Sequence, residues 1–115
     1  MDIKQHSPSF SATGQLQPDD LADCADHGFA TIVNNRPDGE EEGQPTSQQI
    51  AAEAQRLGLG YAYLPIVPGQ MTDLDARAFG DIMAASDGPV LGFCRTGKRA
   101  EGIWQRAGEL GLLAD

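Results

Sequence analysis

Two kinds of hydrophobic pattern alternate along the chain. Short runs of β-prone apolar residues predict strands, and they cover residues 29–33, 61–67 and 90–93. Longer segments with apolar residues at helical spacing predict helices, and they cover residues 18–28, 46–58, 72–85 and 99–110. A weaker alternation over residues 9–13 predicts a short edge strand that ends at Gly14. Strands that alternate with helices of this length predict right-handed crossovers, and so an α/β fold with a mainly parallel sheet.

Capping residues mark the start of two predicted helices. Thr46 or Ser47 is expected to cap the helix that ends near Gly58. Thr72 is expected to cap the next helix, with Asp75 in the reciprocal position of a capping box. Both helix starts are therefore predicted to be sharp.

The length and composition indicate one globular domain, which we predict to span residues 1–115. The formal net charge of −9 and the pI near 4.4 argue against nucleic acid or an anionic membrane surface as a partner. No apolar run approaches the roughly 18 residues of a membrane span. The first residues carry no signal-peptide pattern, so a cytoplasmic location is expected. The two cysteines form no disulfide framework, and Cys24 is interpreted as a small buried hydrophobe in a helix.

The candidate chemistry lies between Pro89 and Leu110. A strand there leads into Cys94 and a short loop, and a helix begins near Arg99. Unpaired amide groups at a helix start and the helix dipole bind anions, and both favour the thiolate form of a nearby cysteine. We therefore predict that Cys94 is a nucleophile that acts on a small anionic or sulfur-centred substrate.

The loop itself offers further binding groups. Arg95 and Lys98 add positive charge, and Gly97 is expected to permit a turn that a side chain would block. Arg99 can donate a planar fork of hydrogen bonds to an oxyanion. Thr96 is expected either to bind the thiolate or to cap the helix. A basic loop in an acidic chain favours a small anion held locally.

Other segments are predicted to reach the same site. Parallel sheets bind ligands beyond the carboxyl ends of their strands. This rule gathers Arg36, Asp38 and Gln70 around the crevice near Cys94, although they are distant in sequence. The acid run Glu40–Glu42 is interpreted as solvated loop.

The sequence resembles a known family. The loop GFCRTGKRA is similar to the active-site loop of cysteine-dependent phosphatases and rhodaneses. The whole chain resembles the bacterial family called beta-lactamase hydrolase-like protein, phosphatase-like domain (DUF442), through the segments SATGQLQPDDL, TIVNNRPDGEE and YLPIVPGQMT. This resemblance implies a dual-specificity-phosphatase-like fold, in which a small parallel sheet of about four strands is flanked by helices. It also implies that Cys94 is the nucleophile and Arg99 the anion-binding arginine.

The loop departs from the phosphatase pattern. Phosphatases of this type carry Cys-x5-Arg, whereas here Ala100 stands six positions after Cys94 and Arg99 comes one position early. A Cys-x4-Arg loop is the length found in rhodanese-like sulfurtransferases. Phe93 occupies the position of the usual histidine. Asp73 lies where phosphatases carry a general acid, and its place in the first turn of a helix also explains it structurally.

These observations leave three hypotheses. The first is a rhodanese-like sulfurtransferase that forms a Cys94 persulfide from thiosulfate or another persulfide. The alternative is a phosphatase that hydrolyses phosphate esters through a phosphocysteine. The second alternative is a non-catalytic module that binds oxyanions or senses oxidants.

The resemblance also implies a partner. Related domains occur fused to a metallo-β-lactamase-like protein that handles sulfur compounds, so an enzyme of that kind is expected as a partner. The chain has no His-rich metal motif of its own, and no metal or other cofactor is expected.

Overall fold

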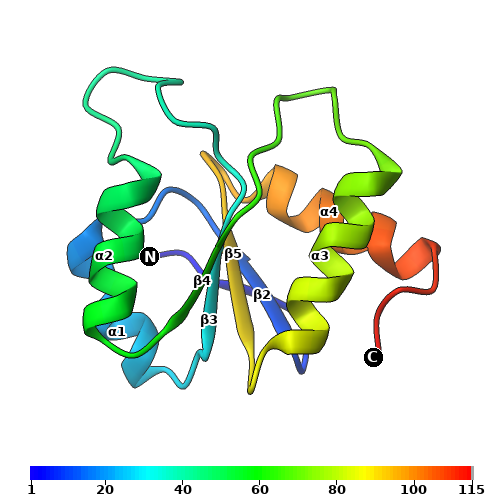
Figure 1. Ribbon diagram of the computed structural model, residues 1–115, viewed down its shortest axis with the longest axis horizontal. Coiled ribbons are helices and arrows are strands. Elements are labelled where there is room, and N and C mark those ends of the chain that lie inside the picture. Colours follow the sequence, from blue (N-terminus) through cyan, green and yellow to red (C-terminus); the bar gives the residue numbers. More distant parts are fainter. Residues whose placement is uncertain (115) are drawn as a thin grey trace.

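The computed structural model describes residues 1–114, which form one five-stranded sheet with helices on both faces (Figure 1). The strands are β1 (Lys4–Ser7), β2 (Phe10–Thr13), β3 (Thr31–Asn34), β4 (Gly60–Tyr63) and β5 (Val90–Phe93). The helices are the 3-10 helix η1 (Pro18–Asp20) and the α-helices α1 (Leu21–Asp26), α2 (Ser47–Arg56), α3 (Asp73–Ala85) and α4 (Lys98–Glu109). The predicted α/β class is confirmed. Within the described residues no helix is long and apolar enough to cross a lipid bilayer.

β5 is the central strand of the sheet, whose order is β1-β2-β5-β3-β4. β1 runs antiparallel to β2, and the other neighbouring strands are parallel. Phe93 at the end of β5 lies opposite Thr13 of β2 on one side and Asn34 of β3 on the other. The carboxyl ends of these three strands are therefore level, and the segments that follow them meet at one edge of the sheet.

Two hydrophobic layers fill the spaces between the sheet and its helices. α1 and α2 cover one face, and α3 and α4 cover the other (Figure 1). The buried residues on the α3 and α4 side are Phe10, Ala12, Val33, Ile66, Ala76, Phe79, Val90, Ala100, Ile103 and Ala107. Those on the α1 and α2 side are Leu16, Leu21, Cys24, Ile32, Ile50, Ala54, Leu91 and Phe93. β5 supplies both layers, because successive side chains of a strand point to opposite faces.

The amino-terminal strands differ from the prediction. The sequence predicts an edge strand over residues 9–13, but β2 is an inner strand that is buried along its length. β1 covers its outer edge, so the sheet has five strands rather than about four. β1 reads Lys-Gln-His-Ser and has no apolar alternation from which a strand could be predicted. Its His6 ring packs instead on Phe10 and Trp104, with centroid distances of 6.0 and 5.2 Å.

The predicted helix starts are confirmed. Thr46 Oγ1 accepts a hydrogen bond from the N–H of Gln49 at 3.1 Å, and Thr72 Oγ1 accepts one from the N–H of Asp75 at 3.2 Å. In both helices the partner side chain accepts a bond from the N–H of the capping threonine. These capping boxes fix where α2 and α3 leave the loops that border the site.

Gly92 of β5 allows the Phe10 ring to approach the centre of the sheet. A Cβ at Gly92 would lie 3.1 Å from two carbons of this ring. The ring cannot give way easily, because it is fully buried and packs edge-on against Phe79 with a centroid distance of 5.3 Å.

We predict that Gly92→Ala lowers the free energy of unfolding by about 1–3 kcal/mol, because it overpacks this core. Urea unfolding measures the change. Gly108→Ala in α4 is the control, since its new Cβ would meet only Leu113 at 3.8 Å. Equal stability of Gly92→Ala and the unsubstituted protein would contradict the packing described.

Candidate active site

Cys94 is the first residue after the central strand β5, and its side chain is fully buried. The segments that follow the neighbouring strands are bonded to the chain around it. The N–H of Gln15 donates to the carbonyl of Arg95 at 3.3 Å, and the N–H of Asn35 donates to the carbonyl of Phe93 at 2.8 Å. Cys94 therefore lies where the carboxyl ends of three parallel strands meet, the edge at which such sheets bind ligands.

The loop after Cys94 folds back onto its sulfur atom. The N–H of Gly97 donates to Cys94 Sγ at 3.1 Å, so a hydrogen-bond donor points at the atom that would carry a negative charge. Gly97 has a φ of 94°, in the left-handed region that favours glycine. A Cβ there would also lie 3.3 Å from the backbone of Thr13. The predicted need for glycine in this turn is confirmed, and α4 begins at Lys98 as expected.

One carboxylate joins the two arginines nearest the loop. Arg99 donates to Glu40 from Nη1 at 2.7 Å and from Nη2 at 3.0 Å, and Arg36 donates to Glu40 from Nε at 2.9 Å. Arg36 is buried and donates also to Gln15 Oε1 at 2.9 Å. Arg99 donates also to the carbonyl of Ile66 at 2.9 Å. The cluster of Arg36, Glu40 and Arg99 thus connects segments that follow β2, β3, β4 and β5.

The charges of this cluster stabilise one another. The hydrogen bond from Arg99, followed by that from Arg36, lowers the pKa of Glu40 to about 2 although burial opposes the change. The contact with Glu40 raises the pKa of Arg99, and the nearby Cys94 acts in the same direction. Glu40 is therefore ionised at any physiological pH. Its carboxylate binds the guanidinium groups of Arg99 and Arg36 in the way that an anionic ligand would.

A hollow of about 430 Å³ opens at this cluster, and we call it the anion hollow. Its lining residues are Arg36, Glu40, Glu41, Pro68, Arg95 and Arg99. Three arginines against two glutamates leave the lining net positive, which suits an anionic ligand. The structure thus brings Arg36, Arg95 and Arg99 together around one hollow. The buried Cys94 does not line this hollow, and it is near enough to Arg99 to raise the pKa of that guanidinium.

Asp38 and Gln70 do not line the anion hollow, contrary to expectation. Asp38 Oδ1 accepts the N–H of Ser47 at 2.7 Å, and the N–H of Asp38 donates to the Tyr63 hydroxyl at 2.9 Å. Asp38 therefore ties its loop to the start of α2. Gln70 is exposed in the turn after β4, where its N–H donates to the carbonyl of Val67 at 3.0 Å.

Asp73 is held by an arginine of α4 instead of facing the thiol. Arg106 donates to its two carboxylate oxygens at 2.8 and 3.1 Å, and this contact lowers the pKa of Asp73. A general acid must keep its proton until the leaving group departs. The environment of Asp73 opposes that role, and its side chain serves to join α3 to α4.

Thr96 and Lys98 face a different hollow from the anion hollow. Both are exposed, and they line a space of about 350 Å³ together with residues of β1 and β2. Thr96 Oγ1 accepts the N–H of Lys98 at 3.4 Å, but the residue at the capping position of α4 is Gly97, so the expected cap at Thr96 is wrong. Their expected contact with substrate is not supported by this placement.

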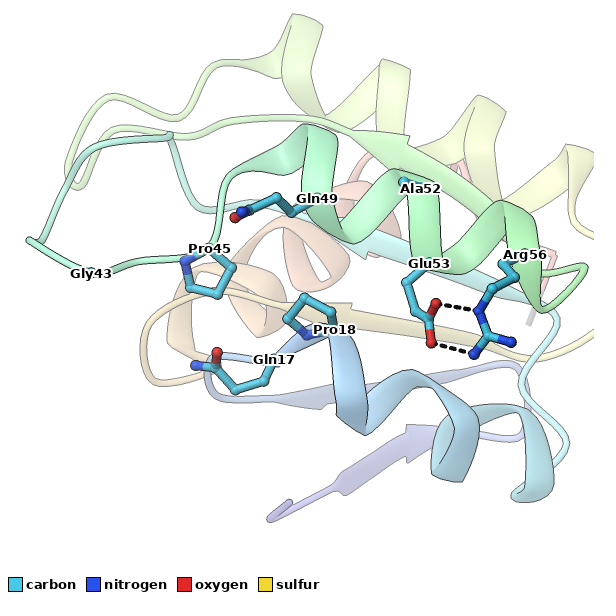
Figure 2. Close-up of a pocket in the computed structure, with 8 residues that line it drawn as sticks. All are labelled: Gln17, Pro18, Gly43, Pro45, Gln49, Ala52, Glu53 and Arg56. Carbon is cyan, nitrogen blue, oxygen red and sulfur yellow. Dashed lines mark hydrogen bonds and ion pairs between the residues drawn. The ribbon is translucent and has the colours of Figure 1, made fainter.

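Two other features are less suited to chemistry than Cys94. Burial raises the pKa of Cys24 to about 11, which supports its interpretation as a small hydrophobe. An open hollow of about 610 Å³ lies between α2 and the start of η1 (Figure 2). Its charged residues Glu53 and Arg56 bind each other at 2.6 and 2.7 Å. The described residues that line it include neither a cysteine nor a histidine.

Sequence reasoning missed three residues of the site. Glu40 was expected in a solvated loop, but the loop after β3 carries it back to the two arginines. The sequence predicts no role for Gln15, which binds Arg36. It predicts only the end of a strand at Gly14, where a Cβ would lie 3.1 Å from the carbonyl oxygen of Arg95. The sequence offers one signal for the Glu40 contact, which is that the acid run Glu40–Glu42 closely follows Arg36 at the end of a predicted strand.

We predict that Glu40→Gln weakens the fold in a pH-dependent way. Because the pKa of Glu40 falls from 4.5 to about 2 on folding, its contacts stabilise the protein above pH 4.5 and this stabilisation is lost as the pH falls toward 2. Glu40→Gln should lower the free energy of unfolding at neutral pH by about 1 kcal/mol, since solvent screens a partly exposed pair. It should also reduce the loss of stability in acid.

Urea unfolding at neutral pH and at about pH 3 measures both effects, with the exposed Glu42→Gln as the matched control. If Glu40→Gln and the unsubstituted protein lost the same stability in acid, the described role of Glu40 would be wrong.

Comparison with known proteins places the chain among phosphatase-like domains. A family model described as beta-lactamase hydrolase-like protein, phosphatase-like domain, matches residues 2–110. A beta-lactamase hydrolase-like protein of Xylella fastidiosa is 36% identical over 100 residues, which are 87% of this chain and 23% of that protein. Its namesake in Agrobacterium fabrum is 40% identical over 91 residues, covering 79% of this chain and 21% of that protein. The chain thus spans less than a quarter of these curated relatives.

Solved structures share the fold. A candidate phosphatase from Neisseria meningitidis has a TM-score of 0.82 and 33% identity, and the match covers 93% of this chain and 77% of that one. A candidate DUF442 phosphatase from Shewanella putrefaciens has a TM-score of 0.78 and 20% identity over 95% of this chain and 69% of its own. P. aeruginosa TpbA, solved in complex with pTyr, has a TM-score of 0.63 and 14% identity, and the match covers 96% of this chain and 74% of that one. The predicted phosphatase-like fold is confirmed.

Proposed function

The chain belongs to the family of beta-lactamase hydrolase-like protein, phosphatase-like domains, and we propose that it hydrolyses phosphate monoesters with Cys94 as the nucleophile. The observation that carries the proposal is the position of the Cys94 sulfur, which lies 3.1 Å from the N–H of Gly97 and beside Arg99 at the end of the central strand. The similarity to candidate phosphatases supports this reaction ahead of sulfur transfer, which the loop length alone favours.

The reaction proceeds in two displacements. The Cys94 thiolate attacks phosphorus, the ester P–O bond breaks, and the leaving oxygen takes the electron pair and a proton from water. Water then attacks the phosphocysteine, the P–S bond breaks, and phosphate and a proton are released with the thiolate restored. Arg99 and Arg36 neutralise the charge on the phosphoryl oxygens in both steps. Since Asp73 is held by Arg106, the reaction favours esters whose leaving group departs without an acid.

Glu40 must release the guanidinium groups when substrate binds. The carboxylate and a phosphoryl group compete for the same donors on Arg99 and Arg36. In the absence of substrate, Glu40 holds these donors in place and keeps the buried Arg36 paired. Exchange of one anion for another keeps an anion at these donors and so avoids an unpaired buried cation.

Sulfur transfer remains a second candidate, because Cys94 and Arg99 are separated by four residues as in rhodanese-like enzymes. In that reaction the Cys94 thiolate attacks the outer sulfur of thiosulfate and the S–S bond breaks. Sulfite leaves with the electron pair, and a persulfide remains on Cys94. Cyanide can then take the outer sulfur as thiocyanate and restore the thiolate.

The expected partner and location stay predictions. The curated relatives are more than four times as long as the matched segment, and we propose that a metallo-β-lactamase-like enzyme that handles sulfur compounds acts together with this domain. The chain is also expected to act in the cytoplasm, on a small anion rather than on nucleic acid or at a membrane.

We predict that Cys94→Ser lowers the hydrolysis of an aryl phosphate about a thousandfold or more, because a serine hydroxyl is a far weaker nucleophile than a thiolate. Phosphate release from phenyl phosphate measures the activity, and thiocyanate release from thiosulfate and cyanide is followed in parallel. Cys24→Ser is the matched control, since this thiol is buried in α1 and plays no part in the reaction.

Phosphate release that survives Cys94→Ser would contradict the proposed nucleophile. Thiocyanate release that depends on Cys94, without phosphate release, would favour the second candidate. If neither reaction occurs while phosphate still raises the melting temperature, the domain is a binding module rather than an enzyme.

A further inference from the structure

We propose that a second hollow, which Arg99 also lines, binds a hydrocarbon group carried by the anionic substrate. This space has a volume of about 300 Å³, and we call it the Gly102 hollow. Its lining residues are Ile66, Gly69, Met71, Arg99 and Gly102. The inference rests on the proposed function in one respect. It requires that the anion bound at Arg99 also carries the hydrocarbon group.

Arg99 connects the Gly102 hollow to the anion hollow. Its side chain lines both, and Pro68 of the anion hollow is followed directly by Gly69 of the Gly102 hollow. The bond from Arg99 Nη1 to the carbonyl of Ile66, 2.9 Å long, fixes the guanidinium at the boundary between them. An ester whose anion binds this guanidinium therefore has its substituent within reach of the Gly102 hollow.

The lining favours hydrocarbon over polar groups. Among residues 1–114, those that line the Gly102 hollow include no carboxylate, and apart from Arg99 they are Ile66, Met71 and two glycines. The stem of an arginine and the thioether of a methionine both pack well against apolar and aromatic groups. A substituent with several hydroxyl groups would lose its hydration there without gaining partners.

The surface beside the hollow is also apolar. Val67 and Met71, in the connection between β4 and α3, are 49% and 38% exposed, and Leu74 in the first turn of α3 is 75% exposed. Met71 lines the Gly102 hollow itself, and Val67 directly follows Ile66, which also lines it. The hydrocarbon group would therefore lie between this connection and α4.

Gly102 keeps the hollow open. It lies inside α4, where glycine is less favourable than alanine. Within the part of the chain that the structure describes, a Cβ at Gly102 would meet no atom within 4 Å, so packing does not require glycine here. Residues three apart on a helix share a face, which places Gly102 beside Arg99. Because Gly102 has no side chain, space remains next to the guanidinium of Arg99. A group of the substrate can fill this space.

The test compares phenylphosphonate with methylphosphonate, which carry the same kind of anion on a carbon–phosphorus bond that the proposed reaction does not break. Isothermal titration of the whole chain should show phenylphosphonate binding roughly tenfold more tightly, because it buries more apolar surface. Gly102→Leu fills the hollow and should remove most of this preference, and Gly102→Ala should remove part of it. Gly108→Ala, in the same helix and outside both hollows, is the matched control.

Equal binding of the two phosphonates by the unsubstituted protein would overturn the inference, and so would a preference that survives Gly102→Leu. Thermal unfolding checks that each variant is folded, which is expected because a helical glycine is replaced by a better helix former. The titration requires no turnover. A protein that prefers phenylphosphonate but releases no phosphate from phenyl phosphate would support the Gly102 hollow and contradict the proposed hydrolysis.

Discussion

The contact of Glu40 with Arg99 and Arg36 organises the whole site. A single carboxylate receives three guanidinium hydrogen bonds, and these arginines in turn hold Gln15 and the carbonyl of Ile66. Without Glu40, the buried Arg36 would keep one weak carboxylate contact, with Glu41 at 3.4 Å. The protein thus builds an anion site and fills it with its own anion, which the substrate of the proposed reaction would have to replace.

The sheet order explains why these groups meet. β5 lies between β2 and β3, so the residues that follow each of these strands reach the same edge although they are distant in sequence. Glycines at positions 14 and 97 allow the backbones after β2 and β5 to approach closely. The first of the two hydrophobic layers holds α4 on the sheet, which aims the start of this helix at Cys94.

Much of the fold could be predicted from local patterns. The strands around Ile32 and Leu91 and the caps at Thr46 and Thr72 were predicted because periodicity and capping act over a few residues. β1 could not be predicted, because an edge strand needs only backbone pairing and its residues are polar.

Local sequence patterns predict the site residues that lie in one continuous motif or at the end of a strand. The loop from Cys94 to Arg99 is such a motif, and Arg36 followed from its place at a strand end. The partner of Arg99 is Glu40, 59 residues away, and no local rule pairs them. The sequence predicts chemical roles for Asp38 and Asp73, because both lie near the expected crevice. In the structure their carboxylates bind Ser47 and Arg106 instead, and these contacts are structural.

The central claim is that Cys94 accepts a phosphoryl group from a substrate held by Arg99. The most direct measurement is to incubate the protein with radiolabelled aryl phosphate, denature it rapidly at neutral pH, and locate the label by peptide mapping. Label on the peptide that contains Cys94, retained in Cys24→Ser and absent in Cys94→Ser, is the predicted result. Phosphate release without any label on Cys94 would contradict the account.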